Sequence, residues 1–164
     1  MRVLGVDPGT ARMGWGVVEG DEEAQLVAYG TLTTPAGQPL ATRLYTLHQE
    51  LREVVARYRP DTAALEELFF ARNVRTAFAV GQARGAALVA LAEAGLSVHE
   101  YSPLEVKQAV TGYGAAEKAQ VQEMVRALLS LDEIPRPDDA ADALAVAVCH
   151  FHSARMQELL AQAE

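Results

Sequence analysis

The chain has 164 residues, of which 50% are hydrophobic and 22% are charged, and this suits one globular domain with a single core over residues 1–164. No apolar run approaches the roughly 20 residues of a membrane span, and no charged and then apolar leader opens the chain, so we expect a cytoplasmic protein without a membrane partner. The single cysteine excludes an internal disulfide, and the formal net charge of −8 argues against a general nucleic-acid binder.

Charge is unevenly distributed along this acidic chain. Between Leu68 and Ala92 there is no acidic residue, whereas Arg72, Arg75 and Arg84 all fall within that stretch. Divalent cations bound by carboxylates would also reduce the net negative charge of the protein before a nucleic acid binds. The net charge therefore makes DNA binding less expected without excluding it.

The first third of the chain predicts three strands and a helix. Residues 3–6, 14–19 and 24–33 have the composition of short strands, and glycine-containing turn signals separate them. Apolar residues then recur at spacings of three and four over residues 40–58, which is typical of an amphipathic helix, and a proline follows its end.

The remainder predicts strands that alternate with helices. A short apolar strand over residues 62–65, a helix over about 74–94 and a strand over 97–101 come first. Two shorter helices then surround a glycine-rich loop, and a final helix opens near Pro137, with its extreme C-terminus (about 157–164) expected to fray. This order predicts an α/β protein with a mixed five-stranded sheet flanked by helices, which fits an RNase H-like fold and also other mixed layouts.

Four carboxylates stand out by their positions: Asp7, Glu66, Asp139 and Asp142. Asp7 and Glu66 each end an apolar strand, whereas the two later aspartates are three residues apart near the start of the final helix and so share a face. If these acids converge at one edge of the sheet, they could hold Mg²⁺ or Mn²⁺, hard cations that take oxygen ligands. Two such ions can clamp the attacking and leaving oxygens of a phosphodiester.

Each acid also has a purely structural interpretation. Asp7 could form an Asx-turn, and Glu66 could be an exposed strand end. Asp138 and Asp139 could cap the final helix or interact with its dipole. Asp142 is harder to explain in this way, because its alanine and leucine neighbours indicate a buried helix. Taken singly, each acid favours the structural interpretation, but as a set the four favour metal binding.

Gly14 and Gly16 flank Trp15 inside a predicted strand. Glycine weakens a strand unless another backbone or a ligand approaches closely. A bend in a twisted sheet would explain the two glycines, and so would room for a phosphate backbone beside Asp7.

Two short motifs precede and follow the first helix: Val6-Asp7-Pro8-Gly9 with Gly14-Trp15-Gly16, and Leu65-Glu66 with Phe69. They resemble the first two motifs of RuvC-type Holliday junction resolvases. Further similar segments follow in the family's order and spacing: Gly81-Gln82-Ala83-Arg84-Gly85, Val106-Lys107-Gln108, Ala116-Glu117-Lys118 and Asp139-Ala140-Ala141-Asp142-Ala143-Leu144-Ala145. The ordered series covers nearly the whole chain, which makes it far more specific than a lone Asp-Pro-Gly.

The resemblance implies an RNase H-like, metal-dependent endodeoxyribonuclease that acts on four-way junction DNA in recombination and repair. Such enzymes work as homodimers, nick two strands of like polarity symmetrically, and act beside a branch-migration helicase complex. The resemblance also implies two Mg²⁺ or Mn²⁺ ions per active site. The family's four metal ligands and catalytic acids fall on Asp7, Glu66, Asp139 and Asp142.

The resemblance further assigns residues around these acids. The alignment of the Asp-Ala-Ala-Asp run selects Asp139 over Asp138. Lys107 and Lys118 would lie near the scissile phosphate or its flanks, although spacing alone favours solvated lysines on a helix surface.

The loop after the fourth strand carries two aromatic residues, Phe69 and Phe70. Because the family uses an aromatic at Phe69, the resemblance assigns stacking on an unpaired base to that residue and leaves Phe70 open. Either aromatic could instead dock the loop beneath the next helix. Three nearby residues are expected to contact phosphates: Arg72, Asn73 and Arg75. The Cys-His-Phe-His segment at 149–152 has side chains that point in different directions on a helix, so we interpret it as structural.

The helix over about 74–94 carries Gly81 and Gly85 four residues apart, among several alanines. Glycine costs about 1 kcal/mol against alanine inside a helix, so a pair of glycines indicates a packing reason. Packing on its own sheet would explain part of this surface, but the helix is apolar over much of its circumference. We therefore expect a twofold dimer through Gly81 and Gly85.

Three other functions remain open from the sequence. A YqgF-type nuclease that acts on structured RNA shares the strand-Asp-Gly opening, but the aromatic loop and the Asp-Ala-Ala-Asp helix favour the resolvase. A sugar-kinase or actin-like ATPase has a similar phosphate loop, yet that fold needs two such domains and this chain is too short. A non-catalytic junction-binding module would not need all four acids, and all four are present, which favours an enzyme.

Overall fold

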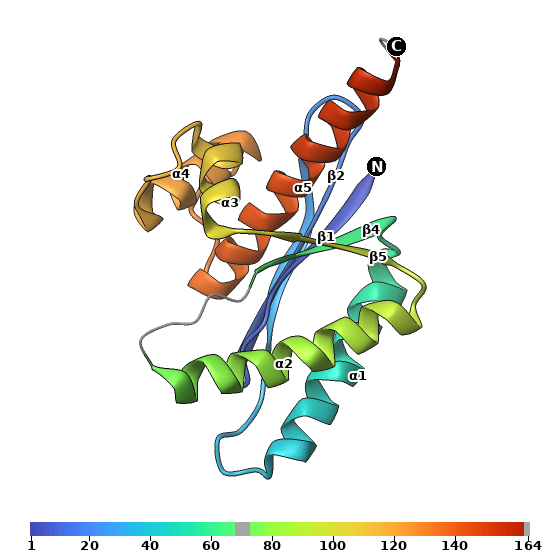
Figure 1. The fold of residues 1–164 in the computed structure, drawn as a ribbon, viewed down its shortest axis with the longest axis vertical. Helices are drawn as coiled ribbons and strands as arrows, with labels where there is room; N and C mark the ends of the chain where they lie inside the picture. Colours follow the sequence, from blue (N-terminus) through green and yellow to red (C-terminus); the bar gives the residue numbers. More distant parts are fainter. Residues whose placement is uncertain (68–72, 163–164) are drawn as a thin grey trace.

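The computed structural model describes residues 1–67 and 73–162, and its fold is built on a five-stranded sheet (Figure 1). The strands, in chain order, are β1 (Arg2–Asp7), β2 (Arg12–Glu19), β3 (Gln25–Thr33), β4 (Thr62–Glu66) and β5 (Ser97–Tyr101). Their spatial order is β3-β2-β1-β4-β5, with antiparallel pairing among β1, β2 and β3 and parallel pairing of β4 with both β1 and β5. The expected mixed sheet is confirmed.

Helices cover both faces of this sheet. In the described part of the chain they are α1 (Leu40–Tyr58), α2 (Val74–Glu93), α3 (Pro103–Thr111), α4 (Lys118–Leu128) and α5 (Asp138–Gln162). The pair α1 and α2 packs on one face, and α5 packs on the other with α3 and α4 beside it (Figure 1). The bounds agree closely with those expected from the sequence, because turn and cap residues delimit the elements.

Each face of the sheet has its own hydrophobic core, since side chains alternate between the two faces along a strand. In β1, Val3 packs toward α5, while Leu4 and Val6 pack toward α1 and α2. In β4, Ala64 and Leu65 divide between the two cores in the same way. A strand buried on both faces forms a continuous apolar run, which explains why β1 and β4 lack an alternating pattern.

The first half of α5 is enclosed by protein. From Ala140 to Phe151 every residue except Asp142 is buried, because the sheet covers one side of the helix and α3 and α4 cover the other. Beyond the sheet the helix becomes exposed, and Met156 and Leu160 are accessible. The expectation of a buried final helix is confirmed. Across residues 1–67 and 73–162, no helix has both the length and the apolar character needed to cross a bilayer.

Glycines in β2 let α5 lie directly on the sheet. A Cβ on Gly14 would overlap the carbonyl oxygen of Asp139, and a Cβ on Gly16 would come within 2.6 Å of the Leu144 side chain. The suggested room for a phosphate backbone at these glycines is therefore wrong. The close partner is helix α5, and its approach is what excludes a side chain there.

The segment at 149–152 is structural, as expected. The buried ring of His150 lies 3.3 Å from the Thr62 hydroxyl and 2.7 Å from the Tyr101 hydroxyl. Burial raises the pKa of the Cys149 thiol to about 12 and lowers the pKa of His150 to about 4. Both side chains are therefore neutral near pH 7. His150 joins α5 to β4 and β5, and the Cys149 thiol lies 3.8 Å from the Glu105 carbonyl oxygen of α3.

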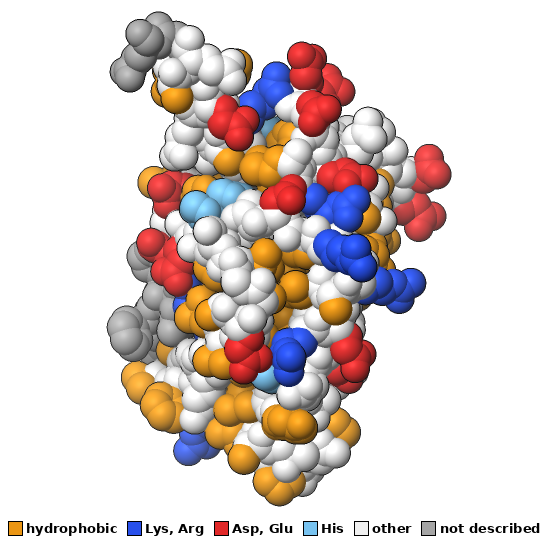
Figure 2. Space-filling view, turned by 90° about the vertical axis from the view of Figure 1, so that its right-hand side faces the viewer, with side chains coloured by type: hydrophobic (Ala, Val, Ile, Leu, Met, Phe, Trp, Pro, Cys, Tyr) orange, Lys and Arg blue, Asp and Glu red, His pale blue; other side chains and the backbone are white. Residues whose placement is uncertain are grey.

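The surface carries charges of both signs. On the face shown in Figure 2, acidic side chains are interspersed with lysines and arginines rather than gathered in one patch. Hydrophobic side chains are more frequent toward the lower end, where α1 lies (Figures 1 and 2). In α1, Leu40 and Tyr45 are both exposed.

Candidate active site

Two of the four acids lie at the ends of neighbouring strands. Strands β1 and β4 are parallel neighbours in which Val6 pairs with Leu65. The next residues along the two strands are Asp7 and Glu66, so both stand at the same edge of the sheet. The expected convergence of strand ends is present in the fold.

Helix α5 brings the other two acids to this edge. Asp7 pairs with Gly14 across β1 and β2, and Gly14 lies against the backbone of Asp139 in the first turn of α5. Asp142 follows three residues later, on the same side of the helix. Three elements therefore contribute acids to one place, because α5 packs across the strand that pairs with Asp7.

The acids influence one another electrostatically. Burial raises the pKa of Asp7 to about 7, and the charges of Asp142, Asp139 and Glu66 add to the increase. Burial, followed by the charge of Asp142, raises the pKa of Glu66. Burial also raises the pKa of Asp142, although Lys118 opposes the change. Partly buried like charges of this kind stabilise a nearby cation.

Lysine and arginine side chains already contact these acids. The Nζ atom of Lys118 lies 2.9 Å from Oδ2 of Asp142, and Nη1 of Arg12 lies 3.4 Å from Oδ2 of Asp139. The charge of Lys107 partly offsets the raised pKa of Glu66. Both lysines singled out from the sequence are thus brought to the acidic cluster.

Asp138 occupies a different position from Asp139. Its Oδ1 atom lies 2.7 Å from Arg136, and its Oδ2 atom lies 3.7 Å from Lys118. Asp139, rather than Asp138, contributes to the raised pKa of Asp7. This geometry supports the choice of Asp139 as the third acid.

The chemistry of the cluster fits a hard divalent cation. Its donors are all carboxylate oxygens. Burial and then the charges of the neighbouring acids raise the pKa of Asp7, and a bound cation would neutralise those charges. Among residues 1–67 and 73–162, however, no three acidic, histidine or cysteine side chains already form a ready-made metal centre. Asp142 and Asp139 are instead engaged with Lys118 and Arg12. Metal binding would require these acids to exchange their ion pairs for a shared cation.

Two cavities flank Glu66. One, of about 170 Å³, is lined by Glu66, Lys107, Lys118 and Asp142 together with apolar residues of α3, α4 and α5. The other, of about 220 Å³, is lined by residues that include Asp7, Glu66 and Arg84. Acidic and basic side chains therefore face open space on both sides of Glu66, where a substrate phosphate could approach.

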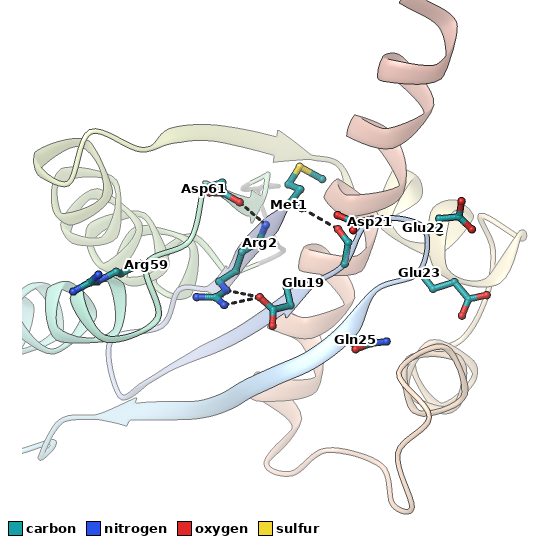
Figure 3. A pocket seen from close by; sticks show the side chains of 10 residues that line it. Met1, Arg2, Glu19, Asp21, Glu22, Glu23, Gln25, Arg59 and Asp61 are labelled. Atoms are coloured by element: carbon teal, nitrogen blue, oxygen red, sulfur yellow. Dashed lines mark hydrogen bonds and ion pairs between the residues drawn. The ribbon is translucent and has the colours of Figure 1, made fainter. Parts of the chain in front are cut away.

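A larger cavity, of about 770 Å³, lies at the opposite end of β1, around Met1 and Arg2 (Figure 3). Two of its acidic side chains interact with Arg2 at the end of the strand. Arg2 forms a 2.5 Å ion pair with Glu19, and the Arg2 amide donates to Asp61 at 2.6 Å. This cavity takes no part in the acidic cluster at Asp7.

The predicted DNA contacts near α2 have different outcomes. Phe69 and Arg72, like Phe70, lie outside the described residues. The Oδ1 atom of Asn73 caps α2 by accepting from the amides of Arg75 and Thr76, at 3.0 and 3.4 Å. The Arg75 residue is exposed. The contacts of these residues with DNA stay predictions.

Sequence reasoning missed two arginines of the site. The sequence indicates only a positive charge at Arg84 and its place in a segment similar to the family, yet its Nη1 atom donates to the carbonyl oxygen of Glu66 at 2.6 Å. Arg12 was not singled out at all. The available signal for Arg84 was a charged residue between small residues on a helix that must pack against the sheet.

Comparisons with known proteins identify the relatives of this chain. The family model for the crossover junction endodeoxyribonuclease RuvC matches residues 3–150. The RuvC protein of Chloroflexus aurantiacus is 63% identical over 155 residues, covering 94% of each chain. That of Caldanaerobacter subterraneus subsp. tengcongensis is 54% identical over 161 residues, covering 98% of each chain.

Solved structures agree with the fold. Thermus thermophilus RuvC in complex with Holliday junction substrate superposes with a TM-score of 0.91 at 45% identity, covering 96% of each chain. The yeast mitochondrial Holliday junction resolvase Ydc2 shares the fold alone, with a TM-score of 0.64 at 12% identity over 94% of this chain and 83% of that chain. The RNase H-like fold expected from the sequence is confirmed. The chain belongs to the RuvC family of crossover junction endodeoxyribonucleases.

Proposed function

We propose that this chain is a structure-selective DNA endonuclease that resolves four-way junctions in homologous recombination and DNA repair. It would hydrolyse one phosphodiester in each of two strands of like polarity. The single observation that carries this proposal is the convergence of acids from β1, β4 and α5 around Asp7, whose pKa rises to about 7. Membership of the RuvC family and the likeness to a relative solved with Holliday junction substrate support it.

We infer that two Mg²⁺ or Mn²⁺ ions are held by the four acids Asp7, Glu66, Asp139 and Asp142. When bound, such ions activate a water molecule and neutralise charge that develops on the phosphodiester. The strand ends would fix Asp7 and Glu66, and the first turns of α5 would orient the two later aspartates. Lys118, which lies 2.9 Å from Asp142, would then be free to turn toward a phosphate oxygen.

The DNA would approach across the two cavities beside Glu66. Lys107 and Lys118 line one of them, so both could contact phosphates next to the scissile bond. We retain the assignment of Phe69 to stacking on an unpaired base. We also retain Asn73 and Arg75, at the start of α2, as phosphate contacts, together with Arg72, which lies outside the described residues.

We infer a twofold homodimer through α2. One side of this helix is exposed and apolar: Val74, Phe78 and Val89 are 74%, 68% and 53% exposed. Gly85 lies on the same side, and a Cβ added there would meet open space, whereas Gly81 is half-buried. The buried alanines, including Ala77 and Ala87, belong to the inner side.

The exposed residues recur at spacings of four, seven and four, so they form one stripe along the helix. A second copy of the chain could lie closely against this stripe, because glycine lets helix backbones approach. A twofold axis would place two acidic clusters symmetrically, which matches paired nicking of a four-way junction. We further infer that this single domain acts in the cytoplasm beside a branch-migration helicase complex.

The proposal is tested by cleavage of three synthetic substrates in Mg²⁺ or Mn²⁺: a four-way junction, a linear duplex of the same sequences and a structured RNA. We expect paired nicks in the junction and little cleavage of the other two. Preferred cleavage of the RNA would identify a YqgF-like nuclease. Tight junction binding without cleavage in either metal would identify a non-catalytic module.

A further inference from the structure

Arg84 connects three elements at the edge of the acidic cluster. It projects from α2, and its side chain is 12% exposed. The Nη1 atom donates to the carbonyl oxygen of Glu66 at 2.6 Å, and the Nη2 atom pairs with Oε1 of Glu100 on β5. We propose that Arg84 is a positioning residue that sets the direction of the Glu66 carboxylate, and so the affinity of the site for divalent cations. The inference rests on the proposed function for its choice of ligand.

Glu66 needs such support because of where it lies. The pairing of β4 with β1 runs as far as Leu65, so Glu66 is the first residue of β4 beyond that register. On its other side the strand is tied to β5, where the amide of Glu67 donates to the carbonyl of Tyr101 at 2.7 Å. Arg84 binds the Glu66 carbonyl, which fixes the peptide plane and with it the exit direction of the side chain.

The contact leaves the carboxylate available for a ligand. Lys118 and Arg12 both contact carboxylate oxygens, which they would have to release when a cation binds. Arg84 instead contacts the backbone of Glu66 and takes its charge partner from Glu100. It therefore supports the backbone of Glu66 without competing with a cation for the Glu66 carboxylate.

The chemistry of the side chain suits this role. A guanidinium group offers several donors in a rigid plane, so it can bond a carbonyl and a carboxylate at once. A lysine ammonium could keep the charge and reach one of the two acceptors. Groups that orient metal ligands in this way typically change metal affinity by about 10- to 100-fold when they are removed.

The test measures binding of Mn²⁺ to the DNA-free protein by isothermal titration calorimetry. Arg84→Gln should weaken Mn²⁺ binding about tenfold or more, and Arg84→Lys should recover part of the loss. Glu100→Gln, which removes the second acceptor, should give a smaller loss in the same direction. The matched control is Arg52→Gln, which removes an arginine that pairs with Glu93 of α2 at 3.4 Å, and it should leave Mn²⁺ binding unchanged.

Two further measurements distinguish a positioning role for Arg84 from a phosphate contact or a packing role. Junction binding without metal should be unaltered in Arg84→Gln, and excess Mn²⁺ should restore much of its cleavage rate. Unchanged Mn²⁺ affinity with weakened junction binding would make Arg84 a phosphate contact and overturn the proposal. Unchanged Mn²⁺ affinity with only a lower Tm would make it a packing residue, with the same consequence.

If Arg84→Gln does not fold, the folded variants Arg84→Lys and Glu100→Gln test the role of Arg84. Wild-type Mn²⁺ affinity in both variants overturns the positioning role, and weakened affinity in both supports it. The proposed function fails separately: a wild-type protein that binds Mn²⁺ through these residues but does not cleave junctions refutes the junction nuclease and leaves the role of Arg84 intact.

Discussion

Gly14 of β2 is in direct contact with the backbone of Asp139 at the start of α5, so closely that a Cβ on the glycine would overlap the Asp139 carbonyl oxygen. Gly14 is also the residue that pairs with Asp7 across β1 and β2. One glycine therefore sets the distance between the first acid of the cluster and the helix that carries two others.

Gly14→Ala should lower both stability and cleavage. The added methyl group must push the first turn of α5 away from the sheet, and overpacking of this kind costs about 1–3 kcal/mol. Urea unfolding and junction cleavage measure the two effects. Gly37→Ala is the control, since a Cβ there meets nothing within 4 Å. Normal cleavage by Gly14→Ala would mean that the position of Asp139 tolerates displacement of α5.

Asp7→Asn should abolish cleavage and stabilise the metal-free protein at neutral and higher pH. The pKa of Asp7 rises from 3.8 to about 7 on folding, so the native state binds the extra proton and its stability falls as the pH rises between these values. The amide does not ionise and so avoids that loss. The free energy of unfolding of the variant should therefore exceed that of the wild type by at most about 4 kcal/mol above pH 7, and the difference should disappear near pH 4. Thermal unfolding in a chelator at several pH values measures it. A gain that does not change with pH would contradict the assignment, and strong cleavage by the variant would refute the role of Asp7 as a metal ligand.

Asp139→Asn should reduce cleavage far more than Asp138→Asn. Asp139 shares its electrostatic environment with Asp7, whereas Asp138 pairs with Arg136. Glu66→Gln and Asp142→Asn should resemble Asp139→Asn, with cleavage lower by orders of magnitude and junction binding kept or tightened, because an amide no longer repels phosphate. Cleavage rates and junction binding measured side by side test this. If Asp138→Asn proves the more damaging change, the third acid has been misassigned.

Phe69→Ala should reduce cleavage of junctions and leave folding largely intact. This expectation comes from the sequence alone, since residue 69 lies outside the described part of the chain. Loss of a stacked base would cost about 1–3 kcal/mol of binding. Thermal unfolding is the decisive companion measurement. A fall in stability of about 3–5 kcal/mol would instead identify a core phenylalanine.

Gly85→Leu should weaken dimerisation before it affects metal binding. A side chain at this position meets open space within one subunit, so the isolated fold should accept it. Across a close helix pair the same side chain would keep the two copies apart. Sedimentation at micromolar concentration, together with the ratio of paired to single nicks, measures the effect. A wild-type protein that is monomeric and still makes paired nicks would refute a stable preformed dimer.

Local patterns in the sequence were sufficient to predict the elements and to single out three of the four candidate acids, whereas the family resemblance was needed to choose Asp139 over Asp138. Strand and helix bounds followed from apolar periodicity and turn residues, which act over a few residues and so can be recognised without the fold. Asp7 and Glu66 could be chosen because each ends an apolar strand. Asp142 could be chosen because a charged residue within a buried helix needs a reason.

The tertiary structure decided which distant groups meet. It showed that Gly14 and Gly16 make room for α5 rather than for a phosphate, that Asn73 caps α2, and that Arg84 holds the backbone of Glu66. The contacts of Gly14, Gly16 and Arg84 join residues that are distant along the chain, whereas the Asn73 cap is local and depends on where α2 begins. No local pattern encodes the distant pairs, because they arise only when α2 and α5 pack against the sheet and bring their side chains to the strand ends.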